Sequence, residues 1–156
     1  MAFVDNAAVR IKLRPLSVAD IDRVCELERK NLPVPWTRAQ VEGEFKKSVG
    51  ILIGLEKNSK LIGYVLSNLV SDELHVLSLC VDRSERRNGY AVMLINHLCE
   101  IAVDRGGLTV WLEVRKSNVA ARALYQKLGF SQHSIRFNYY SDNNEDAVVL
   151  NRELTE

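Results

Sequence analysis

Apolar and polar side chains alternate near the start of the chain. Val9, Ile11 and Leu13 are separated by Arg10 and Lys12. A period of two places successive side chains on opposite faces of a strand, so one face here is apolar and the other is charged. The pattern therefore predicts a half-buried first strand over residues 9–13.

Two helices are expected next. Between residues 21 and 27 apolar side chains recur at three- and four-residue spacing, directly after a capping sequence. Pro33 and Pro35 predict an irregular segment, because proline lacks the backbone donor that a helix needs. Thr37, followed three residues later by a glutamine, forms a second capping sequence and predicts a short helix that ends near Lys47.

Strands and helices then alternate through the rest of the chain. Apolar runs and turn residues predict strands over about 49–55, 61–69, 74–81, 108–115, 131–140 and 147–154, and helices over about 89–104 and 118–128. The resulting order, β-α-α-β-β-β-α-β-α-β-β, predicts an α/β fold in which helices cover both faces of a mixed sheet. No long linker or repeat interrupts it, so residues 1–156 are expected to form a single domain.

Charge and cysteine content narrow the functional classes. With 21 basic and 20 acidic side chains, the net charge of +1 favours neither nucleic acid nor a membrane as partner. Three dispersed cysteines are expected to be reduced core thiols, and His75, His97 and His133 show no metal-ligand spacing and are expected to be structural or exposed. The first residues do not resemble a signal peptide, and no apolar run is long enough to span a bilayer. We therefore expect a cytoplasmic protein without a metal.

One strand-turn-helix segment has the features of an anion site. After an apolar strand over residues 77–81, the chain passes through Arg86, Arg87 and Gly89 into a long helix near Ala91. Free backbone N–H groups and the dipole at a helix N-terminus attract phosphate, glycine permits close approach, and arginine adds positive charge. The segment lacks the signatures of a Walker loop and of a dinucleotide fingerprint. It predicts another kind of phosphate-binding loop, with a capped surface helix as the alternative.

Two motifs in this region identify a family. Arg86-x-x-Gly89-x-Ala91 resembles the acetyl-CoA pyrophosphate loop of the GNAT superfamily of N-acetyltransferases, and Ala123-Leu-Tyr125-Gln-Lys-Leu-Gly-Phe130 is similar to a specific segment of the same superfamily. The resemblance implies a GNAT fold with a mostly antiparallel seven-stranded sheet and about four helices, and acetyl-CoA as cosubstrate without a metal. The residues that it assigns to coenzyme binding are Leu79, Cys80, Val81, Arg87, Asn88, Gly89, Tyr90, Ala91, Val92 and Asn118.

Other segments are closer to one branch of that superfamily. The runs 111–115 and 136–140 and the segment Pro35-Trp36-Thr37 resemble the RimI-like enzymes, bacterial N-terminal alanine acetyltransferases that act on a small-subunit ribosomal protein. This resemblance implies acetyl transfer to the N-terminal α-amino group of a protein, with a ribosomal protein as expected partner and a monomer or weak dimer as expected state. A GNAT enzyme for a small-molecule amine or a lysine is the alternative. A coenzyme A-binding module without turnover is a further one.

Amine acetylation requires a base. An α-amino group has a pKa of about 7.7–8.0, so at neutral pH it is mostly protonated and cannot attack. Strand alternation puts Trp111, Glu113 and Arg115 on one face, and a carboxylate beside a tryptophan is expected to be partly desolvated, with a raised pKa. We therefore choose Glu113 as the base, as the resemblance also does. A simple ion pair between Glu113 and Arg115 is the alternative.

The remaining roles follow from the resemblance. It makes Tyr125 the acid that protonates the departing thiolate, with a core aromatic residue as the alternative. It also implies that backbone groups of Leu79, Cys80 and Val81 hold the pantetheine arm and the oxyanion. The sequence next to Cys80 supplies no cation to stabilise a thiolate, so we expect direct transfer rather than a covalent acyl-enzyme.

Aromatic residues are the candidates for acceptor binding. Trp36 and Tyr139 are amphipathic side chains of a kind used at interfaces, and together they could clamp a peptide N-terminus. A core position is the alternative for Trp36. The acidic Asp142, Glu145 and Asp146 could attract a basic peptide, or could simply be solvated.

Overall fold

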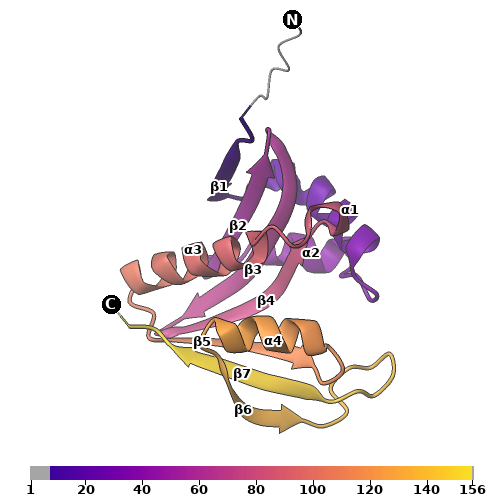
Figure 1. Cartoon of the computed structure of the whole chain (residues 1–156), viewed down its shortest axis with the longest axis vertical. Helices are drawn as coiled ribbons and strands as arrows, with labels where there is room; N and C mark the ends of the chain where they lie inside the picture. Colours follow the sequence, from indigo (N-terminus) through magenta and orange to yellow (C-terminus); the bar gives the residue numbers. More distant parts are fainter. Residues whose placement is uncertain (1–7, 156) are drawn as a thin grey trace, which may run out of the picture.

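Seven strands form one sheet in the order β1-β2-β3-β4-β5-β7-β6 (Figure 1). The computed structural model describes residues 8–155, and its strands are β1 (Ile11–Pro15), β2 (Gly50–Lys57), β3 (Lys60–Val70), β4 (Glu73–Val81), β5 (Thr109–Arg115), β6 (Ser131–Arg136) and β7 (Ala147–Glu153). Neighbouring strands are antiparallel except β4 and β5, which are parallel. The predicted mixed sheet and the predicted order of elements are therefore confirmed.

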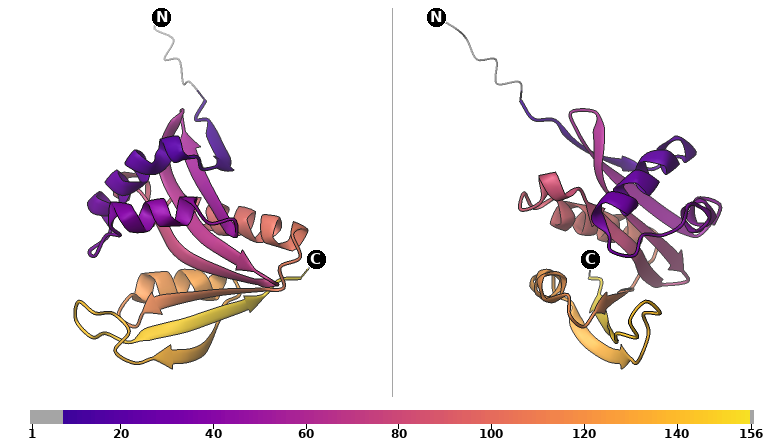
Figure 2. Two further views of the ribbon diagram at one scale, coloured as in Figure 1. Left: turned by 180° about the vertical axis from the view of Figure 1, so that it is seen from behind. Right: turned by 90° about the vertical axis from the view of Figure 1, so that its right-hand side faces the viewer.

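Helices cover both faces of this sheet. One face carries α1 (Ile21–Asn31) and α2 (Arg38–Phe45), and the other carries α3 (Tyr90–Asp104) and α4 (Val119–Lys127) (Figure 2). Two short 3-10 helices, η1 (Val18–Asp20) and η2 (Arg83–Glu85), precede α1 and α3. Each layer of helices thus has its own interface with the sheet.

A hydrophobic core lies on each side of the sheet. Leu94 and Leu98 of α3 belong to a cluster that includes Val110 of β5, and Val24 and Leu27 of α1 belong to a cluster on the opposite face. These helical residues are three or four positions apart, the spacing that places side chains on one face of a helix. The apolar periodicity of the sequence therefore accounts for how both layers attach.

The parallel strands β4 and β5 pair over only part of their length. Their register ends at His75 opposite Trp111, although β4 continues to Val81 and β5 to Arg115. Parallel neighbours need a crossover connection, which here consists of η2 and α3. Beyond His75 the two strands diverge (Figure 1), so the second half of β4 has no neighbouring strand on that side.

A β-bulge lies in β4 just after this point. Two consecutive residues of β3 pair with Val76 and Ser78, so Leu77 has no partner. An extra residue reverses the alternation of the side chains that follow it. Val76 and Leu79 therefore both pack in the α3 layer, whereas Ser78 and Cys80 face α1.

Several element boundaries differ from the prediction by one or two residues, and that of β6 differs by more. β6 ends at Arg136 rather than near Tyr140, because the chain turns at Asn138. That residue has a φ of +53°, and its backbone N–H donates to Asp146 Oδ1 at 2.9 Å. β1 covers Ile11–Pro15 instead of residues 9–13.

Three other expectations concern the chain as a whole. The three cysteines are free and buried, as predicted. Between residues 8 and 155 no helix combines the length and the apolar character that crossing a bilayer requires. The expectation about a signal peptide falls on the first residues, which lie outside the described part of the chain.

Candidate active site

The loop between β4 and α3 presents unpaired backbone donors. Gly89 precedes α3 with a φ of +76°, a left-handed conformation that glycine adopts without strain. The first N–H groups of a helix have no acceptor within the helix, and no side chain at the Gly89 cap position supplies one. The Asn88 amide donates to Glu85 O at 3.0 Å and stabilises the loop. Residues 89–92 therefore offer free backbone N–H groups, and their use as an anion site stays a prediction.

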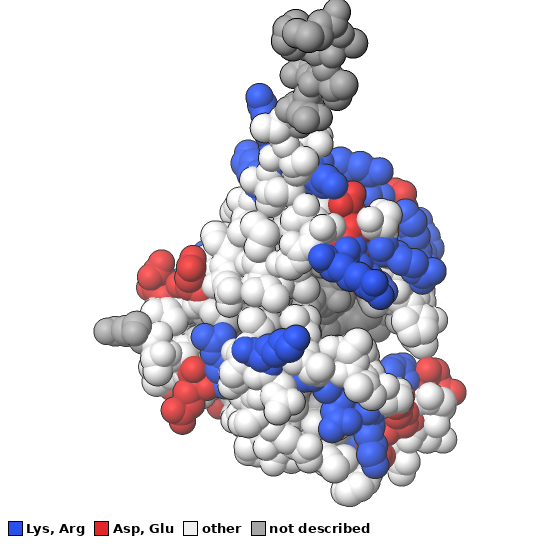
Figure 3. Space-filling view, in the orientation of Figure 1, with Lys and Arg blue, Asp and Glu red and all other residues white. Residues whose placement is uncertain are grey.

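Positive charge surrounds this loop. Arg83, Arg86 and Arg87 have exposed side chains. Figure 3 shows Lys and Arg side chains gathered on this side of the molecule, next to a hollow in its surface. An anionic ligand is attracted to such a face by the local field, although the whole chain is nearly neutral.

The edge of β4 that faces β5 carries free main-chain groups. Asp82 N–H donates to Ile62 O of β3 at 2.7 Å, and the donors of a strand alternate between its two sides. Cys80 therefore also directs its N–H toward β3, whereas Leu79 and Val81 direct theirs toward the side from which β5 has diverged. Of the three residues expected to offer backbone groups, only Leu79 and Val81 have them available to a ligand.

Cys80 is not suited to covalent chemistry. Its side chain is buried, and its Sγ lies 3.9 Å from Leu27 O. Burial raises the pKa of this thiol to about 11. The thiolate is the nucleophilic form, so at neutral pH Cys80 stays unreactive, in agreement with direct transfer.

Glu113 lies close to the point where β4 and β5 part, and its side chain is 11% exposed. Its Oε2 lies 2.7 Å from His75 Nε2, and its Oε1 lies 3.8 Å from Arg136 Nη2. Burial acts to raise the pKa of Glu113, but the hydrogen bond with His75 and the charges of His75 and Arg136 outweigh it, so the pKa is lowered. The expectation of a raised pKa is wrong, because it considered Trp111 and not these two partners.

His75 is a site residue that the sequence did not reveal. It was expected to be structural or exposed, yet one ring nitrogen contacts Glu113 while the side chain remains 41% exposed. The two residues are 38 positions apart, and they meet only because β4 and β5 are neighbours. The one available signal was the alternation of His75 with the apolar residues on either side, which placed it on the polar face of its strand.

Arg115 does not pair with Glu113, so that alternative is wrong. Its guanidinium lies 3.0 Å from Asp142 Oδ1, 3.4 Å from Glu145 Oε1 and 4.0 Å from the centre of the Tyr140 ring. These contacts hold the segment between β6 and β7 against the end of β5. The acidic residues of that segment are therefore engaged within the protein rather than free to attract a basic peptide.

Tyr125 lies in α4 with its ring in the larger core. It packs edge-on against Phe130, with ring centres 5.5 Å apart. Burial raises its pKa to about 12, and the charge of Tyr140 contributes to the same shift. The hydroxyl therefore stays protonated at neutral pH and can act as a donor. Tyr125 is therefore a core aromatic residue, which was the alternative to its role as the acid. The acid role stays a prediction, with which this position is compatible.

The two acceptor candidates differ in exposure. Trp36 packs partly buried against the α1 core, and its backbone N–H donates to Glu28 Oε2 at 3.1 Å. Tyr139 is 45% exposed and lies edge-on to Tyr140, with ring centres 5.1 Å apart. Trp36 thus lies at the edge of the core, which was the alternative to its expected role in acceptor binding. Tyr139, in contrast, is accessible to a ligand.

Asn118 has a structural role of its own. It is the cap residue of α4, and its Oδ1 accepts the backbone N–H of Ala121 at 3.1 Å. Only its side-chain NH₂ group is left for the predicted contact with a pantetheine arm.

Comparison with protein families shows where this arrangement belongs. Residues 21–130 match the model of the Acetyltransferase (GNAT) family. The chain belongs to the GNAT acetyltransferase family. It is an N-acetyltransferase, as predicted, and this family takes its acetyl group from acetyl-CoA.

Relatives of this GNAT acetyltransferase match it over most of their length. The ribosomal protein bS18 alanine N-acetyltransferase of Escherichia coli (strain K12) is 34% identical over 140 residues, which cover 86% of this chain and 92% of that protein. A putative enzyme of the same description from Bacillus subtilis (strain 168) is 30% identical over 139 residues, with 88% and 92% covered. The crystal structure of the ribosomal-protein-S18-alanine N-acetyltransferase from Escherichia coli has a TM-score of 0.89 at 30% identity, covering 94% of this chain and 96% of that one. The predicted GNAT fold is therefore confirmed.

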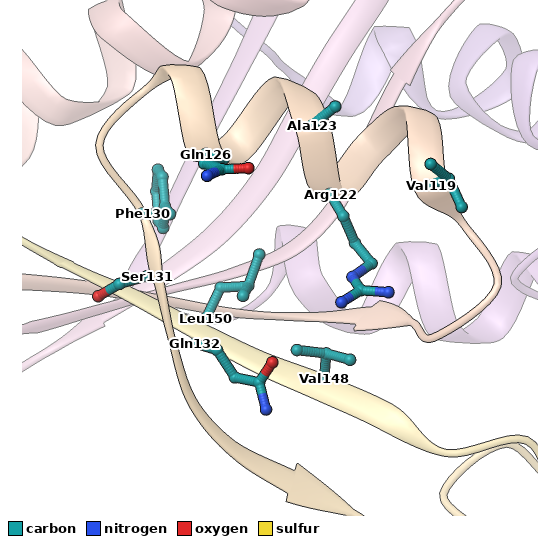
Figure 4. A pocket seen from close by; sticks show the side chains of 9 residues that line it. All are labelled: Val119, Arg122, Ala123, Gln126, Phe130, Ser131, Gln132, Val148 and Leu150. Carbon is teal, nitrogen blue, oxygen red and sulfur yellow. The ribbon is translucent and has the colours of Figure 1, made fainter.

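The acetyltransferase also has a pocket of about 550 Å³ between α4, β6 and β7 (Figure 4). Arg122 and Gln126 of α4 lie over Val148 and Leu150 of β7 in this pocket. None of its lining residues is a predicted catalytic or coenzyme-binding residue. The candidate active site is therefore the gap between β4 and β5.

Proposed function

We propose that this GNAT acetyltransferase transfers the acetyl group of acetyl-CoA to the N-terminal α-amino group of a protein, with the N-terminal alanine of a ribosomal protein as acceptor. By their names, the relatives that cover most of the chain act on an alanine of ribosomal protein bS18. A ribosomal acceptor would place the reaction in the cytoplasm. We propose a monomer or weak dimer that uses no metal.

The divergence of β4 and β5 is the observation that carries this proposal. It leaves main-chain N–H groups of β4 without a partner strand, and the chain leads from them through η2 to the unpaired donors of the α3 N-terminus. Glu113 and His75 lie at the closed end of the same gap. Donors for an anion and a base for an amine thus lie along one opening.

Each part of the coenzyme has a proposed partner. The diphosphate binds the loop and first helical turn formed by Arg87, Asn88, Gly89, Tyr90, Ala91 and Val92. The pantetheine arm runs along the free edge of β4 and contacts the side-chain NH₂ of Asn118. This arrangement brings the thioester to the level of Leu79 and Val81, which are directly N-terminal to the diphosphate loop.

The chemistry is proposed as a direct transfer. Glu113 accepts a proton from the acceptor's α-ammonium, directly or through one water. His75, in contact with Glu113 and partly exposed, then passes this proton to solvent. The amine attacks the thioester carbon, a C–N bond forms, and the negative charge on the carbonyl oxygen is stabilised by backbone N–H groups. When the C–S bond breaks, the Tyr125 hydroxyl donates its proton to the departing sulfur, and the proton that the new amide nitrogen loses restores the tyrosine hydroxyl.

The acceptor is proposed to approach from the face that carries Glu113. Tyr139 lies on that side next to Arg136, whose guanidinium is 5.6 Å from the Tyr139 ring centre and 3.8 Å from Glu113. Tyr139 is proposed to contact the acceptor's first residues. Trp36 is proposed to support the acceptor side from the α1 core, because its ring is partly buried there.

Turnover on a panel of amines tests the proposal. Release of coenzyme A thiol from acetyl-CoA is measured with a short peptide that begins with alanine, the same peptide with a blocked N-terminus, an Nα-blocked lysine peptide and a polyamine. The proposal predicts turnover only with the free alanine N-terminus. Turnover on the lysine peptide or the polyamine alone would identify a different acceptor class. Coenzyme binding without turnover on any amine would indicate a binding module.

A further inference from the structure

A buried ion pair lies where α1 meets the diphosphate loop. Asp82, the first residue after β4, is 3% exposed, and its Oδ2 lies 3.3 Å from Lys30 Nζ and 3.9 Å from Arg23 Nη2. Burial acts to raise the pKa of Asp82, but Lys30, Asn31 and Arg23 outweigh it, so the pKa is lowered. Asp82 is therefore a charged carboxylate at neutral pH, almost without contact with water.

This pair is incomplete. Arg23 Nε donates to Leu61 O at 3.0 Å and Nη1 donates to Glu26 Oε1 at 2.9 Å, which fixes the orientation of the guanidinium. Its Nη2 and Asp82 Oδ1 are both buried, and neither has a hydrogen-bond partner among residues 8–155. One atom is a donor and the other an acceptor, on side chains already in ion-pair range. Because unpaired buried polar groups are unfavourable, a small shift that joins the two side chains is favoured.

Local contacts transmit the position of Asp82 to the diphosphate loop. The backbone carbonyl of Asp82 accepts a hydrogen bond from Glu85 N–H at 2.8 Å. The backbone carbonyl of Glu85 in turn accepts one from the side-chain amide of Asn88 at 3.0 Å. Asp82 is thus connected through two hydrogen bonds to Asn88, the residue before the Gly89 cap of α3. A shift of residue 82 toward α1 that includes its backbone carbonyl would therefore displace the start of the loop.

We propose that Arg23 and Asp82 are positioning residues for coenzyme A. Their hydrogen bond is unmade in the free enzyme, forms when the diphosphate binds the loop, and then holds residues 89–92 in the binding orientation. Neither side chain touches the ligand. The inference rests on the proposed function, because it takes the diphosphate to bind at this loop.

The variant Asp82→Asn separates this role from simple electrostatics. Coenzyme A is an anion, so removing a negative charge near its site should strengthen binding if only Coulomb attraction matters. A positioning role predicts weaker coenzyme A binding instead, because the asparagine amide is a poorer hydrogen-bond partner for the Arg23 guanidinium than the carboxylate is. Glu85→Gln is the matched control, since it removes one negative charge from the same loop. Glu85 pairs with Lys57 at 2.9 Å and has no contact with Arg23 in the described ion pairs.

Calorimetric titration with coenzyme A measures the effect. We expect Asp82→Asn to weaken coenzyme A binding roughly tenfold, and Glu85→Gln to leave the affinity unchanged or slightly higher. The double variant Arg23→Gln/Asp82→Asn should bind no more weakly than whichever single variant binds less tightly, because both substitutions remove the same hydrogen bond. Asp82→Asn binding as tightly as the parent, or additive effects in the double variant, would overturn the proposal. Parent protein that does not bind coenzyme A would instead overturn the proposed function.

Melting temperatures without ligand show whether the variants fold. If Asp82→Asn does not fold, Arg23→Lys provides the test, because it keeps the positive charge and removes the Nη2 donor. We expect Arg23→Lys to weaken coenzyme A binding severalfold while its kcat at saturating acetyl-CoA stays near that of the parent. Unchanged coenzyme A affinity in a folded Arg23→Lys variant would contradict the role.

Discussion

Glu113 has two neighbours with basic side chains, and both affect how it can act as a base. His75 and Arg136 keep its pKa low, so it is ionised throughout the neutral range. A carboxylate with a low pKa takes a proton from an ammonium only in an unfavourable equilibrium. In the proposed mechanism the partly exposed His75 relays the proton from Glu113 to solvent, so we regard the two residues as one unit.

Replacing the carboxylate tests that unit. Glu113→Gln keeps the shape and removes the basic oxygen, and we expect kcat to fall by about 10²–10⁴, the range for loss of a general base. Steady-state acetyl transfer across pH measures it, with the exposed Glu100→Gln on α3 as control. Near-normal turnover at every pH would remove Glu113 from the mechanism.

Tyr125→Phe tests the acid separately. The ring would keep its edge-on contact with Phe130, so the melting temperature should change little. Without the hydroxyl the thiolate departs unprotonated, and we expect kcat to fall by roughly 10²-fold. The same kinetic assay measures it, and a variant as active as the parent would show that another group protonates the sulfur.

At this scale the sequence was informative only within one strand. Alternation in residues 109–115 correctly placed Glu113 opposite the core-facing Val110 and Leu112, because side-chain direction in a strand is local. It could not show that His75 contacts Glu113 or that Arg115 contacts residues 142–145. Those contacts depend on which strands are neighbours and how a loop returns.

At the scale of elements, the site depends on two interruptions of regular structure. The bulge at Leu77 directs Leu79 and Ser78 to faces that uninterrupted alternation would not give them. Gly89 lets the chain enter α3 in a left-handed conformation, which leaves the first helical turn uncapped. The sequence showed the second interruption, because glycine signals it, but a bulge of ordinary residues has no such signal.

A pair of glycine substitutions tests the entry into α3. An added Cβ at Gly89 meets no atom within 4 Å, so only the positive φ opposes Gly89→Ala, which should cost about 1–2 kcal/mol of stability and weaken coenzyme A binding. Gly43 in α2 also has open space but lies inside a helix. Gly43→Ala should therefore stabilise by about 0.5–1 kcal/mol.

Chemical denaturation and calorimetric titration measure both effects. Gly43→Ala is the control for coenzyme affinity, because α2 lies on the opposite face of the sheet from α3. Stability equal to the parent in Gly89→Ala would show that the loop adopts another conformation in solution.

At the scale of the whole molecule, the sheet has two faces to which we assign different proposed roles. The proposed coenzyme loop leads into α3 on one face, whereas Glu113 lies on the face of β5 opposite the α3 core. The divergence of β4 and β5 lies between the two. This division was predictable in outline, because the order of elements and the two family motifs are local in sequence. The partial pairing of β4 with β5 was not, because it depends on the twist and packing of the complete sheet.

Ion pairs spread across both faces predict an acid-sensitive fold. The pKa values of Asp20, Asp82, Glu113 and Glu145 are all lowered, for Asp20 mainly by its hydrogen bonds with Arg14. The unfolded chain then binds more protons than the folded one in acid, so this stability is present above the ordinary carboxyl pKa of about 4 and is lost as pH falls below it. The melting temperature should fall steeply between about pH 5 and pH 3. A flat profile there would contradict these shifts.

The most direct test of the central claim is a crystal structure with coenzyme A bound. We predict diphosphate oxygens within hydrogen-bond distance of the N–H groups of residues 89–92, and the thiol in the gap between β4 and β5, near Leu79, Val81 and Tyr125. Coenzyme A seated in the pocket between α4, β6 and β7, or bound without contact with the α3 N-terminus, would contradict the account.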